Sequence, residues 1–217
     1  MTAGPRRTIV KVCGLTRQED AAHALACGVD WLGFVVKGGS PRLVRPELAG
    51  EIVASLDNII AVAVMVAPTA DEALAIASRM QAKRIQLHRV DARTWPTDFP
   101  LPCAFTMGVD ASGAFHGEEP MPGHLILLDT AHEKLAGGTG RSFPWEAASA
   151  LAQRRDVMLA GGLDANNVVA ALEAADPYGV DASSRLESSP GVKDSELVRR
   201  YVAAVREYDE HRNAATR

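Results

Sequence analysis

The sequence predicts an α/β protein built as a single (β/α)8 barrel of the TIM type over residues 1–217. Short runs rich in β-branched residues alternate with longer alanine-rich segments, which is typical of strand–helix–strand units in a parallel sheet. Eight such runs are present, and eight strands with mostly helical crossovers in about 200 residues favour a closed barrel. An open doubly wound sheet is the structural alternative.

Each predicted strand is a short, mainly apolar run, and six predicted helices lie between or after these runs. The strands are predicted over residues 8–12, 31–36, 59–66, 84–88, 103–109, 125–129, 157–160 and 178–182. The helices are predicted over residues 17–27, 46–56, 69–80, 144–153, 164–174 and 194–208.

Some helix ends carry specific signals. Thr16 is expected to cap the first helix, and Pro46 stands in the first turn of the second. Residues 89–123 are rich in Pro, Gly and His, so helices after the fourth and fifth strands are poorly supported. The tail from Glu207 is expected to fray.

Composition excludes several classes of protein. The chain is 47% hydrophobic and 23% charged, with a net charge of -4 and a pI near 5.9. It has no basic run that could follow a phosphate backbone, so nucleic acid is not an expected partner. No segment approaches the roughly 18 apolar residues of a membrane span, and the first apolar run is too short for a signal peptide. We therefore expect a cytoplasmic protein without a membrane partner.

The three cysteines suggest neither a disulfide framework nor a metal site. Cys13, Cys27 and Cys103 are odd in number and lack the spacing of metal ligands. We expect reduced thiols in a cytosolic protein.

Chemistry in this barrel class collects at the carboxyl ends of the strands, and phosphate commonly binds after strands seven and eight. The first strand leads to Cys13, the sixth ends at Asp129, and Gly161 and Gly162 follow the seventh. Glycines between a strand and a helix let backbone N–H groups approach an anion. A plain tight turn is the alternative interpretation of this pair.

Two further loops open on the same predicted face. Gly138 lies in a Gly-Gly-Thr-Gly stretch after strand six, for which a flexible surface loop is the alternative. Ser183 and Ser184 follow strand eight. Together the loops predict a phosphate site.

Seven motifs in order resemble the phosphoribosylanthranilate isomerase family. They are KVCGLT, GFVV with SPR, QLH, LLDT, GGTG with F and W, LAGGL, and VDASS with ESSPGVKD, and they span residues 11–194. The resemblance implies an Amadori rearrangement of a small phosphoribosyl substrate without metal or organic cofactor. An acid protonates the furanose oxygen to open the ring, and a base then removes the C2 proton.

The resemblance places the base at Cys13 and the acid at Asp129. A lone cysteine at a strand end is more commonly a small buried hydrophobe, and Asp129 could instead cap a helix or form a surface ion pair. An ordinary thiol is mostly protonated and an ordinary carboxyl mostly ionised at neutral pH. The site is therefore expected to lower the thiol pKa, to raise the carboxyl pKa, or to do both.

Four more residues match binding positions or lie beside them. Arg42 falls where the family holds the substrate's aromatic carboxylate, a task suited to a guanidinium fork, with a solvated loop arginine as the alternative. Lys11 shares side-chain parity with Cys13 and could pair with Asp181 inside the barrel. Asp181 could also reach the ribose hydroxyls. His88 could line the mouth, although a histidine bonded to a nearby carbonyl is more common.

Two arginines depart from the family pattern. Arg89 and Arg185 stand where glycine is common. A positive φ at Arg185 would cost about 1 kcal/mol or more, whereas a negative φ would leave it free to add a contact to phosphate.

These departures leave two other functions open: a diverged paralogue acting on a related phosphoribosyl amine, and a barrel that binds sugar phosphate without turnover. The sequence fits a monomer or a homodimer.

Overall fold

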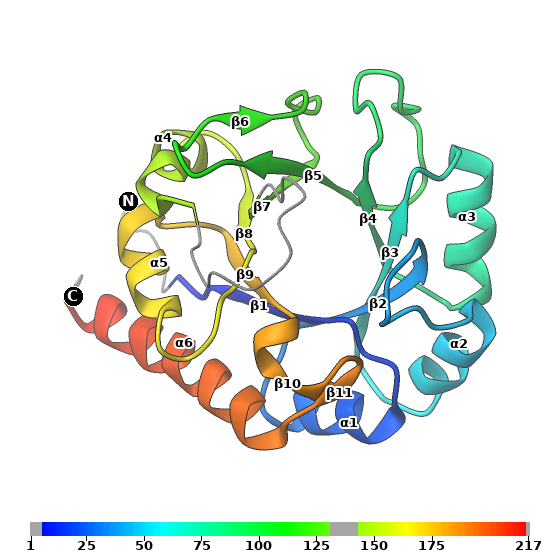
Figure 1. The fold of residues 1–217 in the computed structure, drawn as a ribbon, viewed down its shortest axis with the longest axis horizontal. Helices are drawn as coiled ribbons and strands as arrows, with labels where there is room; N and C mark the ends of the chain where they lie inside the picture. Colours follow the sequence, from blue (N-terminus) through cyan, green and yellow to red (C-terminus); the bar gives the residue numbers. More distant parts are fainter. Residues whose placement is uncertain (1–5, 131–142, 216–217) are drawn as a thin grey trace.

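The computed structural model describes residues 6–130 and 143–215. Eight parallel strands follow the order β4-β3-β2-β1-β9-β8-β7-β5, and a β4–β5 pairing closes the ring (Figure 1). The predicted closed barrel is confirmed, and the open sheet is excluded. The barrel strands are β1 (Ile9–Cys13), β2 (Trp31–Lys37), β3 (Ile60–Val66), β4 (Arg84–His88), β5 (Cys103–Val109), β7 (Leu125–Thr130), β8 (Val157–Leu159) and β9 (Gly179–Ala182).

Helices cover much of the outside of the barrel (Figure 1). They are α1 (Gln18–Ala26), α2 (Pro46–Ala54), α3 (Ala70–Arg79), α4 (Ser149–Ala152), α5 (Val168–Ala175) and α6 (Ser195–Ala215), with the 3-10 helices η1 (Trp145–Ala148) and η2 (Ser184–Leu186). A small hairpin of β10 (Glu187–Ser189) and β11 (Val192–Lys193) follows η2. Each of the eight predicted strands is present, and both of its ends lie within one residue of the predicted ends. Differences of this size are normal for strand and helix limits.

The side of the barrel between β4 and β7 lacks helices. Within residues 89–124, all of which the structure describes, no helix follows β4 or β5. A short strand, β6 (Phe115–His116), instead pairs antiparallel with β5. The weak helix signal after strands four and five is therefore confirmed as a structural feature, and this side is the upper part of the ring in Figure 1.

Local signals fix some helix ends and fail at others. Thr69 caps α3 and forms a reciprocal capping box with Glu72. Pro46 is the first residue of α2, as predicted. The prediction that Thr16 caps α1 is wrong, because Arg17 is the N-cap residue and makes no side-chain cap bond. The Thr16 hydroxyl instead donates to the distant Gly191 carbonyl at 2.6 Å.

Three later helices also differ from prediction. The helix expected over residues 144–153 is divided into η1 and α4. Helix α5 begins at Val168 rather than at residue 164, because residues 164–167 form a turn in which the Asn167 amide group bonds both to the Asp164 N–H and to the Gly162 carbonyl. Helix α6 continues to Ala215, so the fraying expected from Glu207 is not found as far as the structure describes the chain.

Polar contacts with the start of β1 explain why α6 extends so far. The Asp209 carboxylate is buried and accepts from the Thr8 N–H at 2.9 Å and from the Thr8 hydroxyl at 2.7 Å. Near the helix end, the Asn213 side chain bonds to both the N–H and the carbonyl of Arg6, each at 3.0 Å. Tertiary contacts of this kind hold helical residues that local sequence would leave frayed.

The core has two layers because side chains alternate along each strand. One apolar layer packs between the barrel and its helices and includes buried Val10, Val12, Leu32 and Phe34. The other lies inside the barrel and contains alternate residues of the same strands, such as Cys13 and Trp31. Cys103 is buried in the outer layer, as expected of a core residue, whereas Cys27 is only partly buried and packs against that layer.

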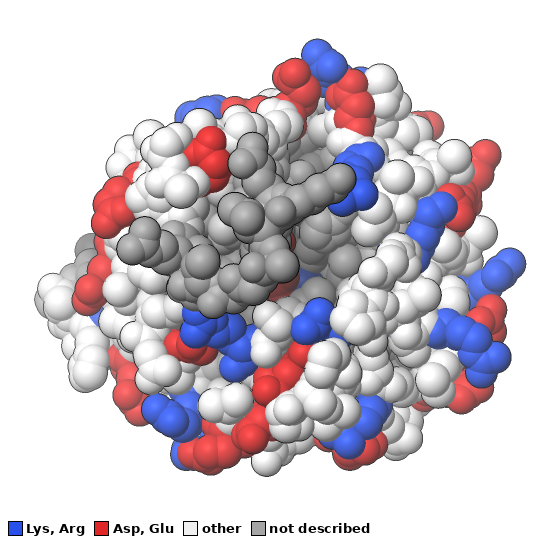
Figure 2. Space-filling model, in the orientation of Figure 1, with Lys and Arg blue, Asp and Glu red and all other residues white. Residues whose placement is uncertain are grey.

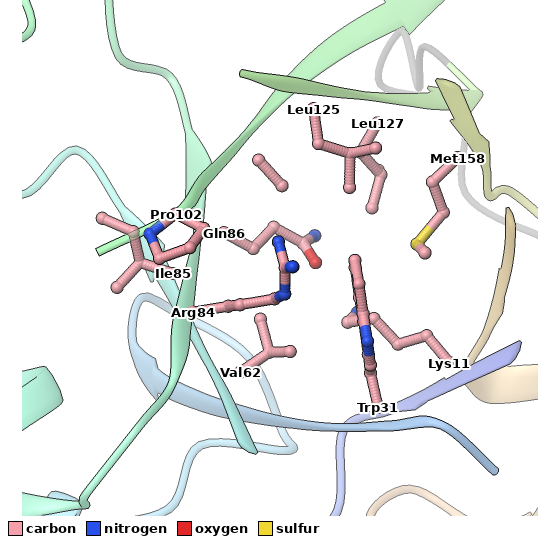
Figure 3. Close-up of a pocket in the computed structure, with 11 residues that line it drawn as sticks. Lys11, Trp31, Val62, Arg84, Ile85, Gln86, Pro102, Leu125, Leu127 and Met158 are labelled. Atoms are coloured by element: carbon pink, nitrogen blue, oxygen red, sulfur yellow. The ribbon is translucent and has the colours of Figure 1, made fainter. Parts of the chain in front are cut away.

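The amino ends of the strands close the floor of the barrel (Figure 3). The Arg84 guanidinium lies 4.3 Å from the centre of the Trp31 ring, a cation–π contact between the starts of β4 and β2, which flank β3. Leu125, Leu127 and Met158 fill the remaining interior and leave a cavity of about 10 Å³. That is roughly the space of one water molecule, so any larger ligand must bind at the other end. In the described part of the chain, no helix is both long enough and apolar enough to span a bilayer.

Candidate active site

Cys13 ends β1 at the carboxyl mouth of the barrel. Its side chain points inward and is only 8% exposed. Gly33 lies opposite it in β2, and a Cβ there would stand 3.0 Å from the Cys13 Sγ and 3.1 Å from the Lys11 Cε. Glycine at position 33 therefore makes room for the side chains of Cys13 and Lys11. Sequence analysis missed this role, although a glycine inside a strand is a known sign of close approach.

Lys11 and Asp181 form the predicted ion pair inside the barrel. The two residues are register partners on β1 and β9, and Lys11 Nζ lies 2.6 Å from Asp181 Oδ2. Their side chains are 1% and 6% exposed. Burial acts to lower the pKa of Lys11, but the Asp181 carboxylate and the Cys13 thiol outweigh it and raise the pKa. Lys11 therefore carries a permanent charge directly below Cys13.

Only one of the two Asp181 carboxylate oxygens has a hydrogen-bond partner among the described residues. Oδ2 is bonded to Lys11, whereas Oδ1 is buried and has no hydrogen-bond partner within residues 6–130 and 143–215. A buried acceptor without a donor costs free energy, so such a group is a candidate ligand contact.

Burial and the neighbouring charges shift the pKa of Cys13 in opposite directions. Burial raises the pKa of the Cys13 thiol, the ammonium groups of Lys11 and Lys193 act to lower it, and Asp181 acts to raise it. The net shift is upward, so the expected lowering of this pKa is absent from the resting site. The two ammonium groups are what would stabilise a thiolate once it forms.

Asp129 is separated from Cys13 by two strands of the barrel. It has the same inward parity as Leu125 and Leu127 on β7, and β9 and β8 separate β7 from β1. Gly161 passes so close that a Cβ there would stand 3.0 Å from Asp129 Oδ1 and 2.3 Å from Thr130 Oγ1. The backbone after β8 therefore packs directly against the carboxylate.

A wide cavity opens beside Asp129, with a volume of about 740 Å³. This size is within the range of small-molecule sites. The Thr106 and Thr130 hydroxyls in its wall are buried and lack partners among the described residues. On the face shown in Figure 2, basic and acidic side chains are interspersed rather than segregated. The cavity wall includes Gly38, Gly39, Ser40, His88, Arg89, Phe105, Gly108, His116 and Glu118.

His88 lines this cavity, as the sequence suggested. Its partner is not a carbonyl but the Gln86 side chain, whose amide nitrogen lies 2.9 Å from Nε2. Burial lowers the pKa of His88 to about 4, and the charges of Lys11 and Arg89 act in the same direction. His88 is therefore a neutral imidazole at neutral pH.

Arg42 lies against Gly14, the residue after Cys13, but is engaged by a partner that sequence analysis missed. Its Nε and Nη2 each donate to the Glu187 carboxylate at 2.8 Å. Lys193 Nζ donates to the same carboxylate at 2.7 Å and to the Ser183 carbonyl at 3.1 Å. Glu187 and Lys193 belong to the ESSPGVKD motif, whose Pro-Gly pair is a turn signal that could have brought the two charges together.

The predicted phosphate loops lie side by side. Gly161 and Gly162 have positive φ angles of 85° and 75°, so this turn requires glycine. A Cβ at Gly162 would stand 3.8 Å from the Arg185 Nε, which brings the loop after β8 next to the loop after β9. Ser184 opens η2 in that second loop, and Ser183 precedes it. Gly138 lies outside the described residues.

The two unusual arginines differ in backbone conformation. Arg185 lies in η2, outside the positive-φ region, and Nη1 pairs with Asp164 at 3.1 Å. The strain considered for this position is therefore absent. Arg89 instead has a φ of 55° and an exposed side chain, so the cost of replacing glycine falls there.

Comparisons with known proteins agree on one family. The family model for N-(5'phosphoribosyl)anthranilate (PRA) isomerase matches residues 10–204. The N-(5'-phosphoribosyl)anthranilate isomerase of Rubrobacter xylanophilus is 41% identical over 205 residues, which cover 91% of this chain and 98% of that protein.

Two solved structures of phosphoribosyl anthranilate isomerases share the fold. One is a complex with reduced 1-(o-carboxyphenylamino)-1-deoxyribulose 5-phosphate, with a TM-score of 0.75 and 27% identity. The other contains monomers generated from the dimeric isomerase of Thermotoga maritima, with a TM-score of 0.76 and 28% identity. Each alignment covers 92% of this chain and 99% of the solved chain.

Proposed function

Because the chain belongs to the N-(5'-phosphoribosyl)anthranilate isomerase family and catalyses this isomerisation in tryptophan biosynthesis, we propose that Cys13 and Asp129 carry out its two proton transfers. The observation that carries this proposal is their placement. Both side chains point inward at the carboxyl ends of strands that β9 and β8 separate, so a substrate between them would present a different atom to each.

The reaction requires an acid first and a base second. Asp129 in its protonated form donates to the furanose ring oxygen, the C1–O bond breaks, and the ring opens to an imine. Cys13 as thiolate then takes the C2 proton, and the electron pair moves to form an enolamine. The enolamine tautomerises to 1-(o-carboxyphenylamino)-1-deoxyribulose 5-phosphate. Lys11 and Lys193 stabilise the thiolate, since both ammonium groups act to lower the Cys13 pKa.

The remaining residues bind the substrate at three points. Arg42 receives the anthranilate carboxylate, and Asp181 accepts from a ribose hydroxyl through Oδ1, which lacks a partner within the described residues. Lys11 orients Asp181 through the buried ion pair. His88 lines the pocket as a neutral side chain.

The phosphate end of the substrate goes to the adjacent loops after β8 and β9. Its ligands are Gly161, Gly162, Ser183, Ser184 and, outside the described residues, Gly138. The position of Arg185 beside Gly162 supports a further charged contact with phosphate.

Two wider properties stay predictions. The free thiols of all three cysteines suit a reducing cytoplasm. A monomer and a homodimer both remain compatible with the chain.

The test of the acid–base pair is the loss of fluorescence when purified protein is added to freshly generated phosphoribosylanthranilate. Cys13→Ala and Asp129→Asn should each lower kcat by about 10²–10⁴-fold, because each removes a proton-transfer group. Cys103→Ala is the matched control, since this thiol is buried in the core at the opposite end of a strand. A Cys13→Ala enzyme with nearly wild-type kcat would refute the assigned base.

A further inference from the structure

The hairpin of β10 and β11 brings two buried charges to the mouth of the barrel. Glu187 and Lys193 are register partners at its two ends, and their side chains are 4% and 2% exposed. Burial acts to raise the pKa of Glu187, but the hydrogen bonds from Arg42 and Lys193 outweigh it, so the pKa lies below its usual range. Glu187 is therefore an anion at neutral pH, and it is shared by two cations.

The hairpin is fixed to the barrel independently of Arg42. The Thr16 hydroxyl donates to the Gly191 carbonyl at 2.6 Å, within the turn of the hairpin. The Lys193 backbone N–H donates to the buried Asp20 carboxylate at 3.0 Å, and Arg17 holds that carboxylate in turn. Glu187 thus projects from a preformed support rather than from a loose loop end.

Arg42 is held from two directions. A Cβ at Gly14 would stand 2.5 Å from the Arg42 Cδ, so the stem of the arginine lies directly over the Gly14 backbone. At its other end, Nε and Nη2 donate to Glu187. These contacts fix the guanidinium plane within range of an electrostatic interaction with Cys13.

The geometry of that pairing leaves half of the guanidinium available. A guanidinium has five N–H donors in a planar fork, and it can receive one carboxylate along its Nε–Nη2 edge and another along its Nη1–Nη2 edge. Glu187 occupies the first edge. No described residue accepts a hydrogen bond from Nη1, so the second edge is open to a ligand.

We propose that Glu187 is a positioning residue for recognition of the substrate carboxylate, which it serves by fixing one edge of Arg42 and so aiming the other at the substrate. Lys193 neutralises part of the Glu187 charge, so that the cluster of two cations and one anion keeps a net charge of about +1 for the incoming carboxylate. This inference rests on the proposed role of Arg42.

The experiment compares two substrates, phosphoribosylanthranilate and the matching phosphoribosyl adduct of aniline, which lacks the carboxylate. Glu187→Gln keeps the shape of the side chain but removes its charge and one strong acceptor. It should raise KM for the anthranilate substrate about 10-fold or more with kcat within about threefold, because it removes binding shared by ground and transition states. For the aniline substrate, kcat/KM should change less than about threefold.

Two controls separate the possible failures. Arg42→Gln should show the same selectivity for the anthranilate substrate; if it does not, the proposed role of Arg42 fails. If Arg42→Gln is selective while Glu187→Gln harms both substrates equally, only the present inference fails. Thr16→Val cuts the other anchor of the hairpin without touching Arg42, and it should not be selective.

A binding measurement covers the case in which Glu187→Gln turns over too slowly to assay. The dissociation constant of the reduced, carboxylate-bearing product should rise about 10-fold or more in the folded variant. Affinity equal to that of the wild type would overturn the inference.

Discussion

On the β1 side of the mouth, charged side chains are buried and paired, whereas on the β4 side they are exposed or neutral. Lys11 is 1% exposed and bonded to Asp181, and Glu187 is bonded to two cations. Across the mouth, His88 is neutral, and Arg89 is exposed and forms no ion pair with the described residues. The first side is preorganised for charge, and the second provides open volume.

The difference follows the secondary structure around each side. On the β1 side, α1, α6 and the β10–β11 hairpin pack close together and exclude water from the ions. On the β4 side no helix follows β4 or β5 in residues 89–124, and the cavity of about 740 Å³ opens there. Fixed charges act more strongly where water is excluded, so we assign recognition of substrate charge to the β1 side.

The largest expected effect comes from breaking the buried pair. Lys11→Met leaves the Asp181 carboxylate buried without its cation, and it should lower the free energy of unfolding by about 3–5 kcal/mol at neutral pH. Urea denaturation measures this change. On the β4 side, Arg93→Met removes an exposed pair with Asp91 and should cost less than about 1 kcal/mol.

A double variant tests whether the loss comes from the uncompensated charge. Lys11→Met with Asp181→Asn removes both ions and should recover part of the stability lost in the single variant. Equal losses for Lys11→Met and Arg93→Met would contradict the contrast between the two sides.

The second effect concerns the neutral histidine. Burial holds the pKa of His88 at about 4 in the folded protein against an ordinary value of 6.5. Between these pH values the unfolded chain binds a proton that the folded protein does not, so stability falls as pH drops from 6.5 to about 4. The loss from this group is about 3 kcal/mol at most.

The measurement is the free energy of unfolding from pH 7 to pH 4 for the wild type and His88→Gln. Glutamine does not titrate, so the variant should lose less stability over this range. If the free energy of unfolding depends on pH in the same way for both proteins, protonation of His88 does not destabilise the folded state.

Local sequence predicted most of the fold because the strands are buried β-branched runs separated by turn residues. The failures lie where distant residues decide the outcome. Thr16 has the side chain of a helix cap, but its hydroxyl is bonded to Gly191. The end of α6 looks frayed in isolation, but the buried Asp209 holds that helix against Thr8.

In the candidate site, too, some contacts were predictable from local sequence and others depended on distant residues. The Lys11–Asp181 pair was predictable, because side-chain parity and strand order place both residues inside a closed barrel. The contact between Glu187 and Arg42 was not predictable, because the two residues are 145 positions apart in the sequence. No local sequence pattern shows where the β10–β11 hairpin packs on the barrel. The candidate site residues were identified largely through family motifs, whereas their partners required the structure.

The smallest effect tests the exposed side directly. Arg89 has a φ of 55°, a conformation that costs a residue with a Cβ about 1–2 kcal/mol relative to its favoured conformations. Arg89→Gly removes that cost but gains entropy in the unfolded chain, so the net stabilisation should be about 0.5–1 kcal/mol. Arg89→Ala is the matched control, because it removes the same charge and keeps the Cβ. If glycine and alanine give equal stability, backbone strain is absent at this position, whereas a gain confined to glycine places the strain on the open side of the mouth.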